Sequence, residues 1–159
     1  MVQPVNPEAS PWIGAAASAA AQSRSAIFEM SRHAESAVID PRDAGGFPSG
    51  WRRAVAARIA TLNALPELAA HYLGSVTDPA LRGLADPAET GREPRERCVI
   101  SFMDRVATQP RAVQAEEIEE LKAAGVAEAD IVRLCELNAF MSYQCRVLAG
   151  LAVLKGASA

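Results

Sequence analysis

Positive charge is scarce in this sequence. Its 14 arginines and 2 lysines are outnumbered by 19 acidic residues, which gives a formal net charge of −3 at pH 7. Proteins that bind nucleic acid carry a surplus of positive charge on one face, because the phosphate backbone dominates the affinity. The charge balance therefore argues against a nucleic-acid partner.

Cysteine is also scarce. Cys98, Cys135 and Cys145 are the cysteines of the chain, and no two of them form a C-x-x-C pair. A secreted disulfide framework and a structural zinc site both need more closely spaced cysteines. We therefore expect neither a metal nor a cofactor, and we expect each cysteine to be a small buried hydrophobic residue.

Aromatic residues make up only 5% of the sequence, whereas alanine occupies 33 of its 159 positions. Alanine is the strongest helix former, and strands are filled by β-branched and aromatic residues. A chain of this length corresponds to one domain. The composition therefore favours a helical domain and disfavours a β-sandwich.

No segment has the full pattern of a signal peptide or a membrane span. The apolar stretch from Trp12 to Ala21 follows no lysine or arginine, although a secretory signal begins with a positively charged region. The most apolar window, Ile131 to Leu154, contains Arg133, Glu136 and Arg146. Each such charge costs roughly 3 kcal/mol at the centre of a bilayer, so we expect a buried helix of a cytoplasmic protein with no membrane partner.

Proline and glycine divide the chain into helical segments. Residues 1–14 are rich in proline and are predicted to form a loosely ordered arm, and residues 15–156 a single helical domain. Apolar residues at helical spacing predict where the helices lie. The expected helices cover residues 16–38, from 49 or 50 to Pro66, 67–76, 80–84, from Pro94 to Pro110, 112–124, and 128–154.

The helix expected over residues 128–154 has apolar residues on two faces. The two stripes are Leu134, Asn138, Met141, Cys145, Leu148 and Ala152, and Leu137, Phe140, Gln144, Val147, Leu151 and Leu154. A helix of this kind is enclosed by the rest of its fold or by another subunit. Since a small domain rarely has enough chain to surround such a helix, we expect a homo-oligomer.

Three stretches of the chain have the order and spacing of a known family. They are Arg52–His71 with Ala57–Asn63 inside it, Pro94–Arg97 with Phe102 and Asp104, and Ile131–Leu151 with Tyr143–Val147 inside it. Together they cover most of residues 50–152. On these residues the chain resembles the carboxymuconolactone decarboxylase superfamily, specifically its alkylhydroperoxidase-D-like, peroxidase-related branch. The resemblance implies an all-α, orthogonal multi-helix bundle that assembles as an oligomer.

The chain differs from that family at the redox positions. Peroxidases of the family carry a C-x-x-C motif, a glutamate twelve residues before its first cysteine, and a histidine just beyond it. Here the cysteine positions fall on Leu65 and Leu68, the glutamate position on Arg53, and the histidine position on Tyr72, with His71 beside it. Dithiol chemistry needs a thiolate of lowered pKa and a resolving thiol, which leucine cannot supply. The resemblance therefore implies the fold without the peroxidase chemistry.

The same region provides the candidate site. Leu65, Leu68 and Tyr72 recur at i, i+3 and i+7, which places them on one helical face with His71 at its edge. The resemblance implies that this face lies against the inner helices. We therefore predict His71 and Tyr72 as acid–base residues. The predicted ligand-binding residues are Leu65, Leu68, Tyr143 and Arg146.

Each charged residue near this face could either act in the site or have only a structural or solvent-exposed role. Glu67 lies one turn before His71 and could raise the pKa of its imidazole, or the two could be an exposed pair. Arg53 and Arg58 could hold an anionic substrate or lie in solvent. Arg146, on the enclosed helix, is expected to be buried, either as a structural anchor or as a corner of the pocket that binds an anion.

Three functions are compatible with this pattern. The first is a redox-inactive domain of the alkylhydroperoxidase-D-like type that binds a small molecule or a partner as a homo-oligomer. The second is a non-redox enzyme, similar to a decarboxylase or isomerase, that uses His71 and Tyr72. The third is an antioxidant thiol peroxidase whose reactive cysteine has moved to Cys98 or Cys145.

Overall fold

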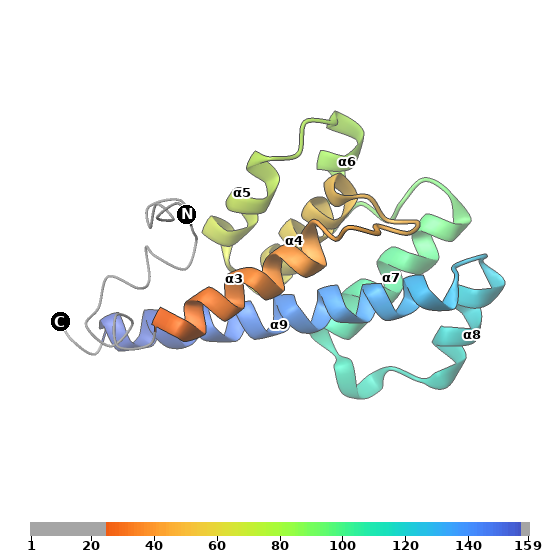
Figure 1. Ribbon diagram of the computed structural model, residues 1–159. Helices are drawn as coiled ribbons and strands as arrows, with labels where there is room; N and C mark the ends of the chain where they lie inside the picture. The colour runs from red at the N-terminus through yellow and green to blue at the C-terminus, as the bar shows by residue number, and fades with distance from the viewer. Residues whose placement is uncertain (1–24, 157–159) are drawn as a thin grey trace.

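The computed structural model describes residues 25–156, which form helices joined by turns, with no strand in that range (Figure 1). This confirms the expected all-α fold. The elements are α3 (Ser25–Ile39), α4 (Ser49–Leu62), α5 (Pro66–Gly74), α6 (Pro79–Gly83), α7 (Pro94–Thr108), a 3-10 turn at Pro110–Ala112, α8 (Ala115–Ala123) and α9 (Glu128–Gly156).

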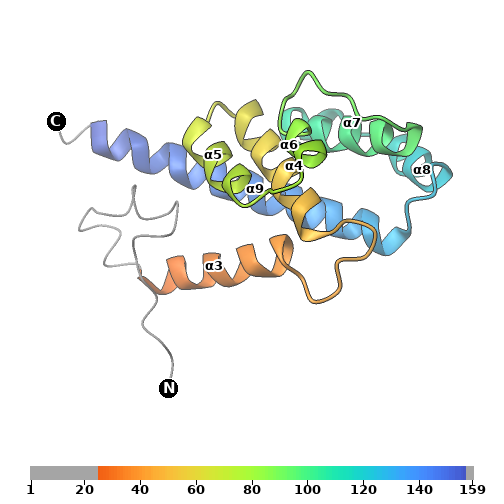
Figure 2. The same cartoon turned by 90° about the horizontal axis from the view of Figure 1, so that it is seen from above.

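Two helices form the centre of the bundle. The long α9 runs the length of the molecule, and α4 packs against α3, α5, α6, α7 and α9 (Figures 1 and 2). Helix α4 can have so many neighbours because it is rich in alanine, whose small side chain lets helices approach closely. Its core residues Ala54, Val55, Ala57 and Ile59 have no exposed surface.

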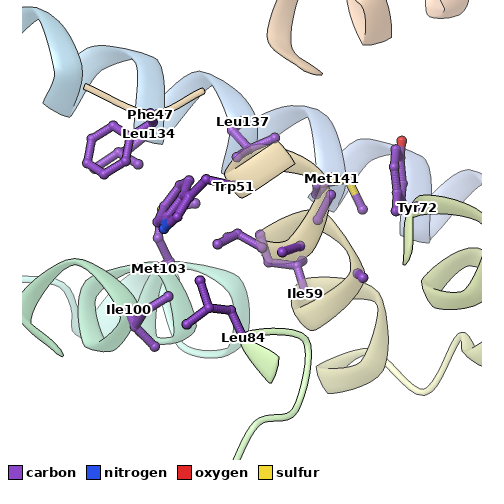
Figure 3. Close-up of a cluster of buried hydrophobic side chains, with 14 of the residues drawn as sticks. Phe47, Trp51, Ile59, Tyr72, Leu84, Ile100, Met103, Leu134, Leu137 and Met141 are labelled. Atoms are coloured by element: carbon purple, nitrogen blue, oxygen red, sulfur yellow. The ribbon is translucent and has the colours of Figure 1, made fainter. Parts of the chain in front are cut away.

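The hydrophobic core lies between α4, α7 and α9. Figure 3 shows Leu137 and Met141 of α9 on one side of this core, Trp51 and Ile59 of α4 in the middle, and Met103 of α7 below them. Burying side chains of this kind contributes about 1.5–3 kcal/mol each. The core therefore fixes the relative positions of the three helices.

Proline sets three helix starts, of which those at Pro66 and Pro94 were expected and that at Pro79 was not. Pro66, Pro79 and Pro94 each stand in the first turn, where the missing N–H costs no hydrogen bond. One expected start is wrong, because α8 begins at Ala115 and not at residue 112. Residues 110–112 form the 3-10 turn, and Gln114 then caps α8 in a reciprocal capping box with Glu117.

The expectation that α9 needs another subunit to enclose it is wrong for its first two thirds. Both apolar stripes are buried as far as Cys145, against α3, α4, α7 and α8 of the same chain. Beyond that point Val147, Leu148 and Leu151 are only half-buried, and Val153 is 72% exposed. Figure 2 shows these last turns extending past α5. The argument for an oligomer therefore rests on the end of α9 alone.

Some predictions fall outside the described residues. The arm predicted for residues 1–14 lies there, and so does the part of the first expected helix before residue 25. Among the helices of residues 25–156, none is long and apolar enough to cross a membrane.

Two buried arginines of α4 hold the loops around the core. Arg52 donates hydrogen bonds to the carbonyls of Val38, Ala44 and Phe47, and so fixes the loop between α3 and α4. Arg58 pairs with Asp104 of α7 through Nε at 2.6 Å and Nη2 at 2.7 Å.

The remaining N–H groups of Arg58 point at the loop between α6 and α7. They donate to the carbonyls of Leu84, Asp86, Pro87 and Glu89. Both expectations for Arg58 are therefore wrong. It is neither solvated nor available to a substrate, because its donors are already bound within the fold.

Candidate functional site

The side chain of Tyr72 lies where α3, α5 and α9 meet. It has no exposed surface. Its hydroxyl oxygen lies 2.8 Å from Glu35 Oε1 of α3 and 2.7 Å from Gln144 Oε1 of α9. Figure 3 shows Tyr72 at one end of the core beside α9. Three helices far apart in the sequence thus each place one polar side chain at the same point.

The hydrogen-bond pattern of this cluster leaves one buried amide atom unmatched. A phenol carries a single proton, so Tyr72 can donate to only one of its two oxygen neighbours at a time. Gln144 Nε2 is buried and has no hydrogen-bond partner within the described structure. Rotating the amide by half a turn would let Nε2 donate to the phenol instead. In the orientation described, Gln144 keeps a polar atom that a ligand or water could bind.

Burial governs the ionisation of the phenol. The pKa of Tyr72 is raised far above its usual value by burial and by the charge and hydrogen bond of Glu35. Its hydroxyl is therefore protonated at any pH at which the protein is folded, and it acts as a neutral donor.

His71 stands beside this cluster and reaches the surface. Its side chain is 35% exposed, and its Nε2 lies 4.0 Å from Glu35 Oε1. Its ring meets that of Tyr72 edge to face, with 5.2 Å between centroids. Burial lowers the pKa of His71, and this outweighs the opposing charge of Glu35. Of the two interpretations of Glu67, the one in which it raises this pKa is wrong, because the nearby carboxylate belongs to Glu35 and the net shift is downward. Glu67 and His71 are both exposed, as the other interpretation has it.

The two leucines that the resemblance aligns with the family's cysteines lie at the start of α5. Leu65 is half-buried just before the helix, and Leu68 in its first turn is only 2% exposed, inside the core. The start of a helix is where the backbone lowers the pKa of a thiol, so cysteines here would be well placed for redox chemistry. Leucines at these positions give an apolar wall instead.

The predicted α9 residues do not join Tyr72. Tyr143 is 39% exposed, and its hydroxyl hydrogen-bonds to Ser31 Oγ at 2.8 Å. Arg146 is exposed, so the expectation that it is buried is wrong. Arg146 lies on the outward face of α9, between the buried Cys145 and the half-buried Val147, and the residue that faces Tyr72 is Gln144.

Sequence reasoning missed Glu35 and Gln144. Gln144 did carry a signal, because it is a polar residue within an apolar stripe, and buried polar residues usually have a specific partner. Glu35 carried none. Its contact with Tyr72 joins residues 37 positions apart, and only the packing of α3 on the bundle brings them together.

The three thiols are not activated. Burial raises the pKa of Cys98 and Cys135, and it raises that of Cys145 to about 11. Cys145 is buried as expected, but Cys135 is exposed, which is a correction. Among the described residues no group of three or more His, Cys, Asp or Glu side chains is placed to hold a metal ion.

Comparison with known proteins supports the fold. No family model and no curated protein matches the sequence. A solved structure, the crystal structure of an uncharacterized peroxidase-related protein from Silicibacter sp. TM1040, is similar with a TM-score of 0.68 and 15% sequence identity. The similarity covers 78% of this chain and 67% of the other. The chain therefore has the all-α fold of a peroxidase-related protein.

Proposed function

We propose that this chain is a small-molecule-binding homo-oligomer of the carboxymuconolactone decarboxylase superfamily, on the alkylhydroperoxidase-D-like branch but without its dithiol chemistry. The observation that carries the proposal is the polar cluster of Tyr72, Glu35 and Gln144, set beside Leu68 at a redox position. Most small-molecule sites combine apolar surroundings with a few directional polar groups. The cluster has both, with Leu68 packed in the core beside it.

The groups of the cluster indicate what kind of ligand would fit. Glu35 supplies a carboxylate acceptor and the Gln144 amide an atom without a partner, while the single proton of Tyr72 is already donated to one of these two side chains. His71 is the most exposed member of the group, with 35% of its side chain exposed against 17% for Glu35. A small polar molecule with both a donor and an acceptor would satisfy these groups.

The second candidate is a non-redox enzyme that moves a proton. The observation that favours it is His71, a half-exposed imidazole of lowered pKa, 4.0 Å from a carboxylate and in ring contact with a phenol. A neutral imidazole near pH 7 can act as a general base. The third candidate, a relocated peroxidase, is disfavoured by the raised pKa of every thiol.

A binding experiment tests the leading proposal. A library of small polar fragments is screened against the full chain by ligand-observed NMR, and the hits are titrated against Tyr72→Phe and Gln144→Leu. We expect both variants to weaken the hits about tenfold, because each removes one hydrogen bond to a buried group. His33→Ala, an exposed residue of α3, is the matched control and should bind normally. Hits that bind both variants as tightly as wild type would contradict the proposal.

Two activity measurements separate the alternatives. Cumene hydroperoxide with dithiothreitol tests the peroxidase, and we expect no consumption beyond that of a variant with all three cysteines changed to serine. A panel of lactone acids and β-keto acids tests the enzyme, through release of carbon dioxide or isomerisation. Turnover that disappears in both His71→Ala and Tyr72→Phe would favour the enzyme over the binding protein.

A further inference from the structure

A separate cavity of about 320 Å³ lies where the loop between α3 and α4 meets the start of α7. Its volume is within the range typical of small-molecule sites. None of the residues of the Tyr72 cluster contributes to it. Its lining residues are Gly46, Phe47, Trp51, Arg92, Glu93, Arg95, Glu96 and Val99.

One wall of the cavity is aromatic and held in place. The rings of Phe47 and Trp51 pack with centroids 4.4 Å apart and planes tilted by 39°. Both residues are buried, and Val99 adds an aliphatic surface beside them. Arg52 donates a hydrogen bond of 2.7 Å to the carbonyl of Phe47, which fixes the loop that carries this ring. The wall is therefore formed before any ligand binds.

The cavity also contains a cation without a carboxylate partner, the guanidinium of Arg95. The guanidinium carbon of Arg95 lies 5.2 Å from the centroid of the Phe47 ring, the distance of a cation–π contact. Among the described residues, no carboxylate is within ion-pair distance of Arg95. The nearby Asp130 is bound instead by Arg133 Nη1 at 2.9 Å and by the N–H of Gly46.

Arg95 and Phe47 together have the protein groups of a site that binds a carboxylate. An arginine fork binds a carboxylate through two parallel hydrogen bonds, and stacking on an aromatic ring orients the fork. A ligand whose carboxylate met Arg95 would place its adjoining ring or chain near Phe47, Trp51 and Val99. An aromatic ring fits this wall best, because aromatic pairs gain energy beyond the area they bury.

The acidic residues of the rim limit the charge of the ligand. Glu93 and Glu96 line the same cavity as Arg92 and Arg95. Glu96 Oε2 accepts a hydrogen bond of 2.7 Å from the backbone N–H of Arg92, so its charge stays close to the cavity. Two carboxylates would repel a dianion more than a monoanion. We propose that this cavity binds a small aromatic monocarboxylate, with Arg95 as its anion-binding residue.

The test uses the full chain and benzoate as the probe. Trp12→Phe leaves Trp51 as the only tryptophan, so its fluorescence reports occupation of the cavity, and calorimetry on the unmodified chain checks the affinity. We expect saturable binding of benzoate, at least tenfold weaker binding of benzamide, and weaker binding of the dianion phthalate. These differences follow from the loss of a charge-assisted hydrogen-bond pair and from repulsion by Glu93 and Glu96.

Substitutions of arginine test whether Arg95 is the residue that binds the carboxylate of benzoate. Arg95→Gln should weaken benzoate at least tenfold, and Arg95→Lys should retain part of the affinity because it keeps the charge but loses the fork. Arg111→Gln removes an exposed arginine from the 3-10 turn after α7 and should leave binding unchanged. Circular dichroism confirms that each variant is folded.

Several outcomes would overturn the proposal. They are a change in Trp51 fluorescence that does not saturate, equal affinity for benzamide and benzoate, and an Arg95→Gln variant that binds benzoate as tightly as wild type. Tighter binding of benzylamine than of benzoate would also reject it, and would assign the cavity to a cation at Glu93. Because Tyr72 and Gln144 do not line this cavity, failure here leaves the function proposed for their cluster untouched.

Discussion

At the scale of single residues, charge and burial compete at His71. The Glu35 carboxylate at 4.0 Å favours the imidazolium, but partial burial and the positive charge of Arg53 oppose it, and the pKa falls below 6.5. Desolvation prevails because the carboxylate lies beyond hydrogen-bonding distance, so its attraction is weaker than the loss of hydration. The imidazole is therefore neutral near pH 7, as a proton acceptor must be.

This balance predicts how stability depends on pH. Because the unfolded state holds a proton on His71 more tightly than the folded state does, stability rises with pH between the folded pKa and 6.5, and falls as pH drops through that window. His71→Gln should remove this part of the slope. Chemical denaturation from pH 5 to 8 measures it, and NMR titration of the imidazole measures the pKa. An imidazole pKa above 6.5 would contradict the prediction.

Substitution of Leu68 tests whether its side chain is part of the core. At 2% exposed it should behave as a core residue, and Leu68→Ala should lower the free energy of unfolding by about 2–5 kcal/mol. Leu65→Ala is the matched control, since Leu65 is only half-buried and should cost less. Urea denaturation measures both. A cost below about 1 kcal/mol for Leu68→Ala would mean that this side chain lines an open space.

At the scale of elements, helices in this protein are joined through arginine as well as through apolar contact. Arg58 ties α4 to α7 through Asp104 and ties the loop after α6 to both. Buried guanidinium groups need such a complete set of acceptors, because an unmatched charge in the interior is costly. The loop over residues 84–89 is thus ordered by a side chain from another element.

Removing this arginine should be costly. Arg58→Ala leaves Asp104 without its partner and frees four backbone carbonyls, so we expect a loss of about 3–5 kcal/mol in the free energy of unfolding. Arg105→Ala, which also removes an arginine that pairs with a carboxylate, is the control. It breaks an exposed ion pair with Glu117 and should cost about 0–1 kcal/mol. Equal effects of the two substitutions in thermal and urea unfolding would refute the structural role of Arg58.

At the scale of the whole molecule, the end of α9 is less covered than the rest of that helix. Val147, Leu148 and Leu151 are half-buried there and Val153 is exposed, whereas the first two thirds of the helix are enclosed by other helices of the chain. Apolar side chains at the end of a projecting helix are a natural contact for a second copy. The proposed homo-oligomer therefore depends on these turns.

A substitution in these turns tests the assembly. If Leu151 packs between subunits, Leu151→Glu should lower the assembly state, because the carboxylate would be buried without a partner. Sedimentation velocity at micromolar concentration measures it, with Ala149→Glu on the exposed side of the same turn as the control. A wild-type chain that sediments as a stable monomer would remove the oligomer from the proposed function.

The sequence by itself determined the helices and most of their boundaries. Proline in the first turn and apolar spacing act locally, so α4, α5, α7 and α9 begin where these signals predict. The sequence also singled out Tyr72, which the structure buries against Glu35 and Gln144. The helix boundaries were predictable because each depends on neighbours a few residues away.

Only the tertiary structure decided what surrounds Tyr72. Its contacts with Glu35 and Gln144 join residues 37 and 72 positions apart. Likewise, Arg58 is enclosed by carbonyls of a loop 26–31 positions away, and Arg146 is exposed because the packing of the bundle turns its face of α9 outward. No local pattern encodes such contacts, since they depend on how whole helices cross and where each one stops.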